Sequence, residues 1–399
     1  MVSEFSAEEI GRLRAETPGC KNVVHFNYAG SALMPQPVID VTIDHITLEG
    51  EIGGYEAADL AEARVEAVYV SVARLLNAKS TEIAVVENAT RAWDMAFYSI
   101  PFQRGDRILT SVSEYASNVI SFLQIAERGV SVEVVPNDEH GQLSVTALKE
   151  LIDDRVRLIA VSHMPTNGGL VQPAADIGKV AKDAGILYLL DACQTAGQMP
   201  LDVEAIGCDM LSVTARKYLR GPRGVGFLYV REDKIESLTP PMLDLHAALW
   251  VARDRYEIRG DARRFENWES SIAGKLGMGR AVDYALDLGL DRIWATLSAR
   301  ASSLRDMLGA IPGVTIRDLG AVKGGIVTFT IDGKTTNEIN AALAERKINT
   351  TSSSIYSTRF DMENREQTQF ARASAHYLTT ETECALLAET VAEIALTRS

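Results

Sequence analysis

The chain has 399 residues, of which 46% are hydrophobic and 24% are charged, and its formal net charge is -14 at pH 7. A chain of this length exceeds one hydrophobic core, so we expect an ordinary globular protein with two domains. The acidic charge argues against electrostatic binding to nucleic acid or an anionic membrane, and no apolar stretch approaches the roughly 20 residues that cross a bilayer.

The N-terminal residues predict a short surface helix. Ser6 and Glu9 fit a capping box, and the segment lacks the basic-then-apolar order of a signal peptide. The four cysteines, at positions 20, 193, 208 and 384, are widely scattered and form no CxxC pair of the metal-binding type. We therefore expect a cytoplasmic protein without a metal site.

Short β-rich runs alternate with helical patterns between about residues 80 and 230. A helix is expected at residues 174–184, and the β-rich runs lie at residues 82–87, 107–112, 131–135, 157–162, 186–190, 209–214 and 225–230. Such alternation predicts an α/β fold with a mostly parallel sheet that is covered by helices on both faces. Ligands of such sheets bind at the carboxyl ends of the strands.

The pattern changes in the second half of the chain. A polar stretch at residues 240–269 is expected to be irregular, and long helices are predicted at residues 273–288 and 291–308. A smaller α+β segment follows, with strands at residues 314–318 and 325–331 and helices at residues 336–346 and 380–396. We predict a large domain over residues 31–284 and a small domain formed by residues 1–30 and 285–399.

An aspartate and a lysine each follow a predicted buried strand. Asp191 ends the apolar run at residues 186–190, and Lys217 comes 26 positions later (217 minus 191), after the run at residues 209–214. A pyridoxal phosphate enzyme needs a lysine amine for its Schiff base and an acid that keeps the pyridine nitrogen protonated. Arg216 and partial desolvation would both lower the pKa of the lysine. The pair therefore indicates pyridoxal 5'-phosphate as the cofactor.

A phosphate site is also predicted. Ala89 and Thr90 follow the strand at residues 82–87 and open a helix, whose N-terminal N–H groups and threonine hydroxyl can bind a dianion. The glycine-rich run at residues 221–226 does not predict a dinucleotide site, because it precedes a strand and no helix follows it.

Several motifs resemble those of the class V aminotransferase family, which comprises fold type I pyridoxal phosphate enzymes such as cysteine desulfurases, isopenicillin N epimerase-like enzymes and hercynylcysteine sulfoxide lyases. The resemblance covers nearly the whole chain. The matching pieces are Phe26-Asn27-Tyr28-Ala29-Gly30, Asn88-Ala89-Thr90, Glu114-Tyr115-Ala116-Ser117-Asn118, His163-Met164-Pro165-Thr166-Asn167, Asp191-Ala192-Cys193-Gln194, Thr214-Ala215-Arg216-Lys217 and Arg372-Ala373-Ser374-Ala375-His376-Tyr377.

The resemblance implies roles for individual residues. Lys217 would form the Schiff base with the cofactor and Asp191 would face the pyridine nitrogen. Arg372 would bind the carboxylate of an amino-acid substrate through a bidentate pair. The other cofactor contacts would come from Gln194 to the phenolic oxygen, from Tyr115 stacked on the ring, from Ala89, Thr90, Thr214 and Arg216 to the phosphate, and from Asn167, where the match can slip onto Thr166.

Further contacts concern the substrate and the assembly. Asn27 is a candidate for substrate binding, and Tyr55, Arg220 and Arg223 are candidates for the far end of the substrate. The resemblance also implies a homodimer whose active sites lie at the subunit interface.

The chain departs from the family pattern in ways that bear on function. Desulfurases of the family carry a reactive cysteine on a loop before the carboxylate-binding arginine, but residues 348–372 contain serines and no cysteine. A serine cannot hold a persulfide. Arg216 stands where many members have a histidine, which keeps a cation for the phosphate but removes a proton shuttle. In residues 264–271, Trp268 and Glu269 replace a Gly-Thr that binds the partner's phosphate, so Ser270 or Ser271 would take that contact.

These observations predict an enzyme that removes the Cα proton of an amino acid. We expect a carbon–sulfur β-lyase that acts on a cysteine conjugate or its sulfoxide, because the loop thiol is missing and the carboxylate arginine is present. The alternatives are a class V aminotransferase or an amino-acid epimerase. A cysteine desulfurase is less favoured, and so is a pyridoxal phosphate-binding protein without turnover.

Overall fold

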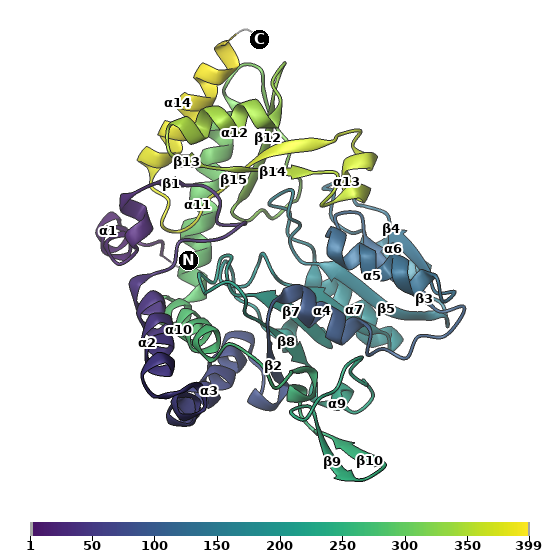
Figure 1. The fold of residues 1–399 in the computed structure, drawn as a ribbon. Coiled ribbons are helices and arrows are strands. Elements are labelled where there is room, and N and C mark those ends of the chain that lie inside the picture. The colour runs from purple at the N-terminus through teal and green to yellow at the C-terminus, as the bar shows by residue number, and fades with distance from the viewer. Residues whose placement is uncertain (1–2, 398–399) are drawn as a thin grey trace.

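Seven strands form a mostly parallel sheet in the computed structural model, which describes residues 3–397 (Figure 1). Their order is β2-β8-β7-β6-β5-β3-β4, and β8 runs antiparallel to both of its neighbours while the other pairs are parallel. The predicted runs are confirmed to within one residue at either end. The strands are β2 (Ile83–Val86), β3 (Arg107–Ser111), β4 (Ser131–Val135), β5 (Val156–Ser162), β6 (Leu187–Asp191), β7 (Met210–Thr214) and β8 (Gly226–Val230).

Helices cover both faces of this sheet, as the alternation predicted. In β6, Tyr188 and Leu190 belong to one core cluster, whereas Leu189 belongs to the cluster on the other face. The first cluster includes side chains of α3 (Gly54–Leu76), α6 (Val145–Leu151), α7 (Ala174–Ala184), α8 (Val203–Ile206) and α10 (Ile272–Leu288). The second includes side chains of α4 (Ala89–Phe97), α5 (Ala116–Ala126) and α9 (Glu232–Ile235). The strands therefore alternate between two cores.

A second, antiparallel sheet lies in the C-terminal part of the chain. Its order is β11-β12-β15-β14, formed by β11 (Val314–Ile316), β12 (Ile326–Ile331), β14 (Thr351–Ser354) and β15 (Gln369–Ser374). Its core cluster contains Phe26 and Phe329 together with side chains of α11 (Leu290–Gly309), α12 (Thr336–Glu345) and α14 (Glu381–Leu396). The predicted strands at 314–318 and 325–331 are confirmed, but β14 and β15 were not foreseen.

The N-terminal segment joins the two parts of the molecule. Helix α1 (Ala7–Ala15) begins with the predicted capping box, in which Ser6 Oγ accepts from Glu9 N and the Glu9 carboxylate accepts from Ser6 N. Strand β1 (Val24–His25) pairs in parallel with β13 (Ile348–Asn349), and α2 (Gln36–Ile52) packs beside α3 and α10. Short helices η1 (Pro18–Lys21), η2 (Ser80–Glu82), η3 (Ala262–Phe265) and α13 (Arg359–Asn364) complete the described chain.

The stretch at residues 240–269 is not irregular throughout, which corrects the expectation. It contains a hairpin of β9 (Ala248–Ala252) and β10 (Arg255–Ile258) that projects from the body of the molecule (Figure 1). Leu249 and Trp250 are exposed on it. The hairpin was missed because its mixed polar and apolar residues pair with each other and not with the buried sheet.

The predicted domain division stays a prediction. The cluster around the large sheet also takes in Phe5 and Ile10 from the N-terminal segment and Leu297 from α11. No helix within residues 3–397 combines the length and apolar character that a membrane crossing requires.

Gly178 tests the close packing behind the large sheet. It lies in α7, and a Cβ atom there would come 1.8 Å from the backbone oxygen of Ile206. We expect Gly178→Ala to lower the free energy of unfolding by about 1–3 kcal/mol, because overpacking forces the backbone to shift. Gly11→Ala in α1 is the control, since a Cβ there meets no atom within 4 Å, and it should stabilise slightly. Urea unfolding measures both; an unchanged Gly178→Ala midpoint would contradict the packing.

Candidate active site

A pocket lies at the carboxyl ends of β5, β6 and β7, where the fold predicts ligand binding. Asp191 is the last residue of β6, Ser162 is the last residue of β5, and Lys217 comes three residues after β7. The motifs that contain Asp191 and Lys217 therefore meet at one pocket, as predicted. The lining is formed by Ala89, Thr90, Tyr115, Asn118, Ser162, Met164, Thr166, Asp191, Cys193, Gln194 and Lys217.

Lys217 lies in this pocket with part of its side chain exposed. Burial of the ammonium is the main cause that lowers its pKa. The positive charges of Arg216 and Arg372 lower the pKa further, whereas Asp191 and Cys193 oppose them. A lysine with a lowered pKa is more often a neutral amine, which is the form that attacks an aldehyde or accepts a proton.

Asp191 is held in place by two donors. Its Oδ1 accepts from the backbone N of Cys193 at 2.9 Å, and its Oδ2 lies 3.2 Å from Nδ2 of Asn118. The residue is buried, and the strand β6 fixes its backbone. The carboxylate therefore has one orientation, toward the pocket that it lines.

The start of α4 supplies the predicted anion site. Asn88 caps the helix, with its side-chain oxygen accepting from the backbone N of Arg91 at 2.9 Å. Ala89 and Thr90, the first helical residues, line the pocket. Their backbone N–H groups are among those that no intrahelical acceptor satisfies, so they can bind a phosphate. Thr214 is buried at the end of β7, and neither it nor Arg216 is among the lining residues.

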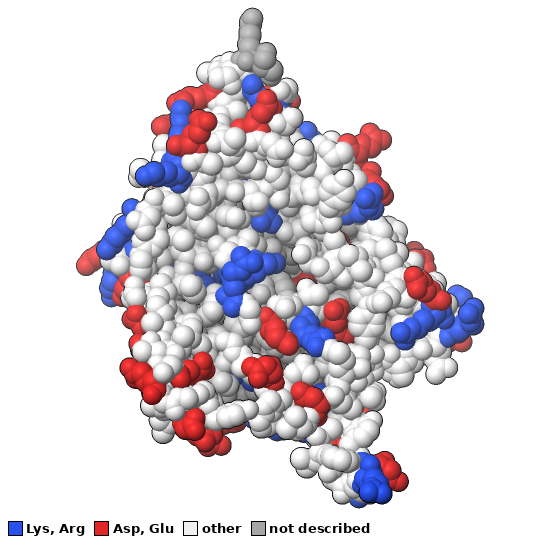
Figure 2. All heavy atoms as spheres, viewed as in Figure 1, with Lys and Arg blue, Asp and Glu red and all other residues white. Residues whose placement is uncertain are grey.

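Arginine side chains gather beside the pocket. Arg372 Nη1 donates to the backbone oxygen of Thr166 at 2.9 Å and to its Oγ1 at 2.7 Å, and Nη2 lies 3.4 Å from Asn27 Oδ1. Burial lowers the pKa of Arg372 to about 10, so it is still charged at neutral pH. Arg216 donates to the backbone oxygen of Gly30. Basic side chains gather near the centre of the face in Figure 2, between the parts that carry the two sheets.

The donors of the pocket fit pyridoxal phosphate. Gln194 Oε1 is buried and has no hydrogen-bond partner among residues 3–397, although its Nε2 donates to Ala29 O at 3.2 Å. Arg372 Nε is likewise buried without a partner in the described chain. Gln194 Nε2 carries a second hydrogen that it can donate to the phenolic oxygen, and Arg372 Nε can donate to a carboxylate, which are the partners predicted for these side chains. Tyr115 borders the same pocket with an exposed ring.

Some predicted site residues are not brought into the pocket. Asn167 is buried, and its Nδ2 donates to Asp361 Oδ2 at 2.5 Å, while Thr166 lines the pocket instead. Of the two residues onto which the family match can fall, Thr166 is therefore the one that reaches the pocket. Tyr55 is 75% exposed at the start of α3 and borders a separate groove. Arg220 is buried, where it donates to Leu33 O, Tyr377 and Thr17, so it is a packing residue and not a substrate ligand.

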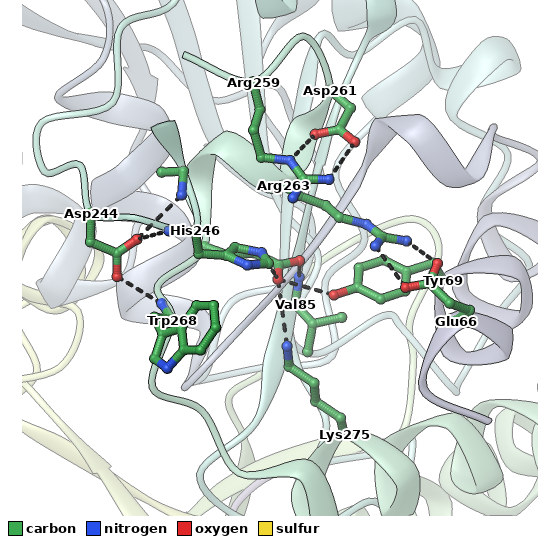
Figure 3. A network of polar contacts seen from close by, with 12 residues as sticks. Glu66, Tyr69, Val85, Asp244, His246, Arg259, Asp261, Arg263, Trp268 and Lys275 are labelled. Carbon is green, nitrogen blue, oxygen red and sulfur yellow. Dashed lines mark hydrogen bonds and ion pairs between the residues drawn. The ribbon is translucent and has the colours of Figure 1, made fainter. Parts of the chain in front are cut away.

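The segment before α10 is fixed by a buried carboxylate, Glu266 (Figure 3). Its Oε1 accepts from the backbone N of Val85 at 2.7 Å, and its Oε2 lies 3.0 Å from Tyr69 Oη, 3.2 Å from His246 Nε2 and 3.5 Å from Lys275 Nζ. Burial alone would raise the pKa of Glu266, but these donors outweigh it and lower the pKa. The network ties this segment to β2, which leads into the anion site.

Asp244 holds the residues that follow. Its carboxylate accepts from the backbone N of Trp268 at 2.7 Å and from that of His246 at 2.9 Å (Figure 3). Ser271 is the N-cap of α10 and accepts from Gly274 N at 3.0 Å. Because the Ser271 hydroxyl already caps this helix, Ser270 is the better placed of the two for a contact outside the chain.

The sequence interpretation gave no role to Glu114, Asn118 or Cys193. Glu114 is buried against Asn118, which contacts Asp191, although only Tyr115 of that motif was given a role. Acid and amide side chains four residues apart at a strand-to-helix junction were the available signal. Cys193 is buried but lines the pocket, and burial raises the pKa of its thiol.

Comparison with known proteins identifies the family. The model of the family "Aminotransferase class-V" matches residues 24–387. A protein of Methanothermobacter thermautotrophicus named "Probable cysteine desulfurase" is 30% identical over 389 residues, which is 96% of this chain and 97% of the relative. A Yersinia pestis protein named "Cysteine desulfurase" is 33% identical over 297 residues, 70% of this chain and 73% of its own. The cysteine desulfurase of Thermococcus onnurineus NA1, solved without ligand, shares the fold with a TM-score of 0.91 at 24% identity, covering 99% of both chains.

These relatives correct the predicted reaction. The expectation of a carbon–sulfur β-lyase for cysteine conjugates is wrong, because the curated relatives that cover most of the chain are named cysteine desulfurases. The cofactor, the fold type and the enzyme class that the motifs indicated are confirmed. The chain belongs to the class V aminotransferase family and is a fold type I enzyme that uses pyridoxal phosphate.

Proposed function

We propose that this enzyme is a cysteine desulfurase that takes sulfur from L-cysteine. The observation that carries the proposal is the joint presence of Lys217, Asp191 and Arg372 around one pocket in a chain that is 30% identical to a "Probable cysteine desulfurase" over 96% of its length. The alternatives of transamination and epimerisation lack support of this kind, because the named relatives all carry the desulfurase name.

Each residue has a distinct task in this proposal. Arg372 holds the carboxylate of cysteine, and Asn27 beside it limits the rotation of the guanidinium. Lys217 supplies the amine that carries the cofactor and then takes the proton from Cα, which its lowered pKa favours. Asp191 keeps a proton on the ring nitrogen. Held by these residues, pyridoxal phosphate would supply an electron sink for the bond that is broken at Cα.

The sulfur must pass to a thiol from outside the chain. In the balanced reaction, L-cysteine and a thiol give L-alanine and a persulfide: the Cβ–S bond and the S–H bond of the acceptor break, and an S–S and a Cβ–H bond form. The acceptor sulfur is oxidised and Cβ is reduced, so no other oxidant is needed. Residues 348–372 contain no cysteine. Cys193 is a poor acceptor, because burial raises its pKa and keeps it a thiol.

We also propose that the enzyme is a homodimer with active sites at the interface. Helices α2 and α3 expose Ile43, Ile46 and Leu60, and the projecting hairpin exposes Trp250; these elements all lie in the lower part of the view in Figure 1. Apolar side chains in such number on neighbouring elements are typical of a subunit interface. Tyr55 and Trp268 border a groove lined by α2, α3 and the segment that leads into α10, where a second copy would cover them.

A reducing, cytoplasmic location is part of the proposal. All four cysteines are free, and Cys193, Cys208 and Cys384 are buried. Free buried cysteines are usual where thiols stay reduced.

Lys217→Ala tests the cofactor attachment. We expect the purified wild-type protein to be yellow with pyridoxal phosphate, and the variant to lose the visible band and at least about 100-fold of its activity, because no other amine replaces it in the pocket. Lys79→Ala, which changes an exposed lysine paired with Glu232, is the control and should keep both. An unchanged visible band in Lys217→Ala would refute the attachment at this residue. Absorbance and cysteine turnover are the measurements.

The products of cysteine turnover test the reaction. With L-cysteine and dithiothreitol as the external thiol, we expect alanine and sulfide in equal amounts, and less alanine when dithiothreitol is left out, because residues 348–372 lack a thiol and cysteine itself is then the external acceptor. Amino-acid chromatography and a sulfide assay measure them. Pyruvate and ammonia in place of alanine would contradict desulfuration, since they result from elimination. Lys217→Ala serves as the blank.

Leu60→Arg tests the assembly. Leu60 is 72% exposed on α3, and we expect light scattering to give twice the chain mass of 43.4 kDa for the wild type and a monomer for the variant, because a buried charge without a partner opposes association. Leu396→Arg is the matched control, since Leu396 is 83% exposed at the end of α14, at the opposite end of the molecule in Figure 1. A wild-type monomer, or a dimer that survives Leu60→Arg, would argue against this interface.

A further inference from the structure

Glu114 is a buried carboxylate to which the proposed chemistry gives no task. It lies between the end of β3 and the start of α5 and is 1% exposed. Its Oε1 accepts from the backbone N of Tyr115 and from Nδ2 of Asn118, both at 2.8 Å. Its Oε2 accepts from the backbone N of Ser162 at 2.9 Å, and the Ser162 hydroxyl also donates to the carboxylate. A carboxylate with this many donors cannot rotate.

Asn118 connects this carboxylate to the site. The same Nδ2 that donates to Glu114 lies 3.2 Å from Oδ2 of Asp191. An amide nitrogen carries two hydrogens, so it can give one to each carboxylate. Glu114 thereby fixes the direction in which the other hydrogen of Asn118 points.

The partners of Glu114 show what the cluster serves. Three of these partners line the pocket: Tyr115, Asn118 and Ser162. Tyr115 is the N-cap of α5, Asn118 lies in α5, and Ser162 ends β5. A carboxylate that only stabilised the fold would contact scaffold residues. Of the other groups near it, Thr110 Oγ1 is more distant at 3.4 Å. The contacts of Glu114 therefore converge on the cofactor site.

We infer that Glu114 is a positioning residue, which through Asn118 orients the Asp191 carboxylate toward the cofactor ring and through the backbone of Tyr115 sets the side chain that borders the ring. The inference rests on the proposed role of Asp191 at the ring nitrogen. It predicts that the electronic state of the bound cofactor, and not only the stability of the fold, depends on the Glu114 and Asn118 pair.

The test is a double-mutant cycle on the holoenzyme. We expect Asn118→Ala to raise the dissociation constant of pyridoxal phosphate by about tenfold, because a hydrogen bond to a charged group is lost, and to shift the pH midpoint of the visible band. In the Asp191→Asn background the same change should have a much smaller effect on both quantities, because the charged carboxylate that Asn118 orients is gone. Gln142→Ala is the control. It removes another buried amide, which donates to Val171 O at 2.6 Å, and should alter stability alone.

The proposed role of Asp191 and the inferred role of Glu114 and Asn118 give different outcomes. If Asp191→Asn changes neither the affinity nor the band, the proposed role of Asp191 fails. If Asp191→Asn acts but Asn118→Ala leaves both quantities unchanged, or acts equally in both backgrounds, only the present inference is overturned.

The thermal stability of the cofactor-free protein gives a second measurement. Burial raises the pKa of Glu114 from 4.5 to about 7, and the charge of Asp191 contributes, while Tyr188 nearby stays neutral because burial raises its pKa. The folded state thus holds the Glu114 proton more tightly than the unfolded chain does, so this contribution to stability is present below about pH 4.5 and is lost as the pH rises through about 7.

Glu114→Gln removes the titrating group at nearly constant size. Between about pH 5 and about pH 8, we expect the Tm of the wild type to fall relative to that of the variant, because only the wild type loses a proton. Parallel Tm curves would contradict the raised pKa of Glu114, whereas the positioning role is decided by the double-mutant cycle.

Discussion

Charge buried at the carboxyl edge of the seven-stranded sheet is the constraint on which the rest of the site depends. Lys217, Arg216 and Arg372 lie near enough to one another that the two arginines lower the pKa of the lysine. Asp191 is the carboxylate that opposes them in the lining of the pocket. Buried charges are costly unless they are paired and hydrogen-bonded. An excess of cations in such a place matches a ligand with a phosphate and a substrate with a carboxylate.

The same constraint explains why the supporting structure is rigid. Glu266 is buried and accepts a hydrogen bond from the backbone N of Val85 in β2. Arg264, in η3, is also buried and donates to the backbone oxygens of Ile235 and Arg259. Arg220 is also buried and donates to the hydroxyl groups of Tyr377 and Thr17. Removing one partner of such a group would leave a charge without compensation. The protein therefore surrounds a few reactive groups with many polar side chains whose only task is to keep positions fixed.

The sequence predicted the regular parts of the fold well, because buried parallel strands and amphipathic helices have a local signature. Strand β4 and helix α7 were predicted with their observed bounds. Strands β14 and β15 were missed, since Thr351–Ser354 is polar and its pairing with β15 is a long-range contact. The site was predicted in outline through Asp191, Lys217, Gln194 and Thr90, which all line the pocket, because strand ends fix where they meet.

The parts of the site that the sequence could not predict depend on contacts between distant segments of the chain. Whether Thr166 or Asn167 faces the pocket depends on a turn after β5, and Asp361 from a distant helix draws the asparagine away. Tyr55 is exposed in a single copy, so a role for it would need the proposed second chain, which the sequence does not describe. Glu114 gave a weak signal because a glutamate is usually exposed to solvent, whereas here its carboxylate turns inward to Ser162.

The missing loop thiol has a different meaning once desulfuration is the proposed reaction. A cysteine on the chain's own loop would make sulfur transfer intramolecular, and groups held together in this way react as if at very high concentration. In the proposed reaction, breaking of the Cβ–S bond would wait for an acceptor that diffuses in, so the acceptor concentration would control the rate. Binding of cysteine and removal of its Cα proton near Lys217 would not use the thiol. Under this proposal, the serines at 352–354 would change what must be present for the sulfur to leave, and not which substrate is activated.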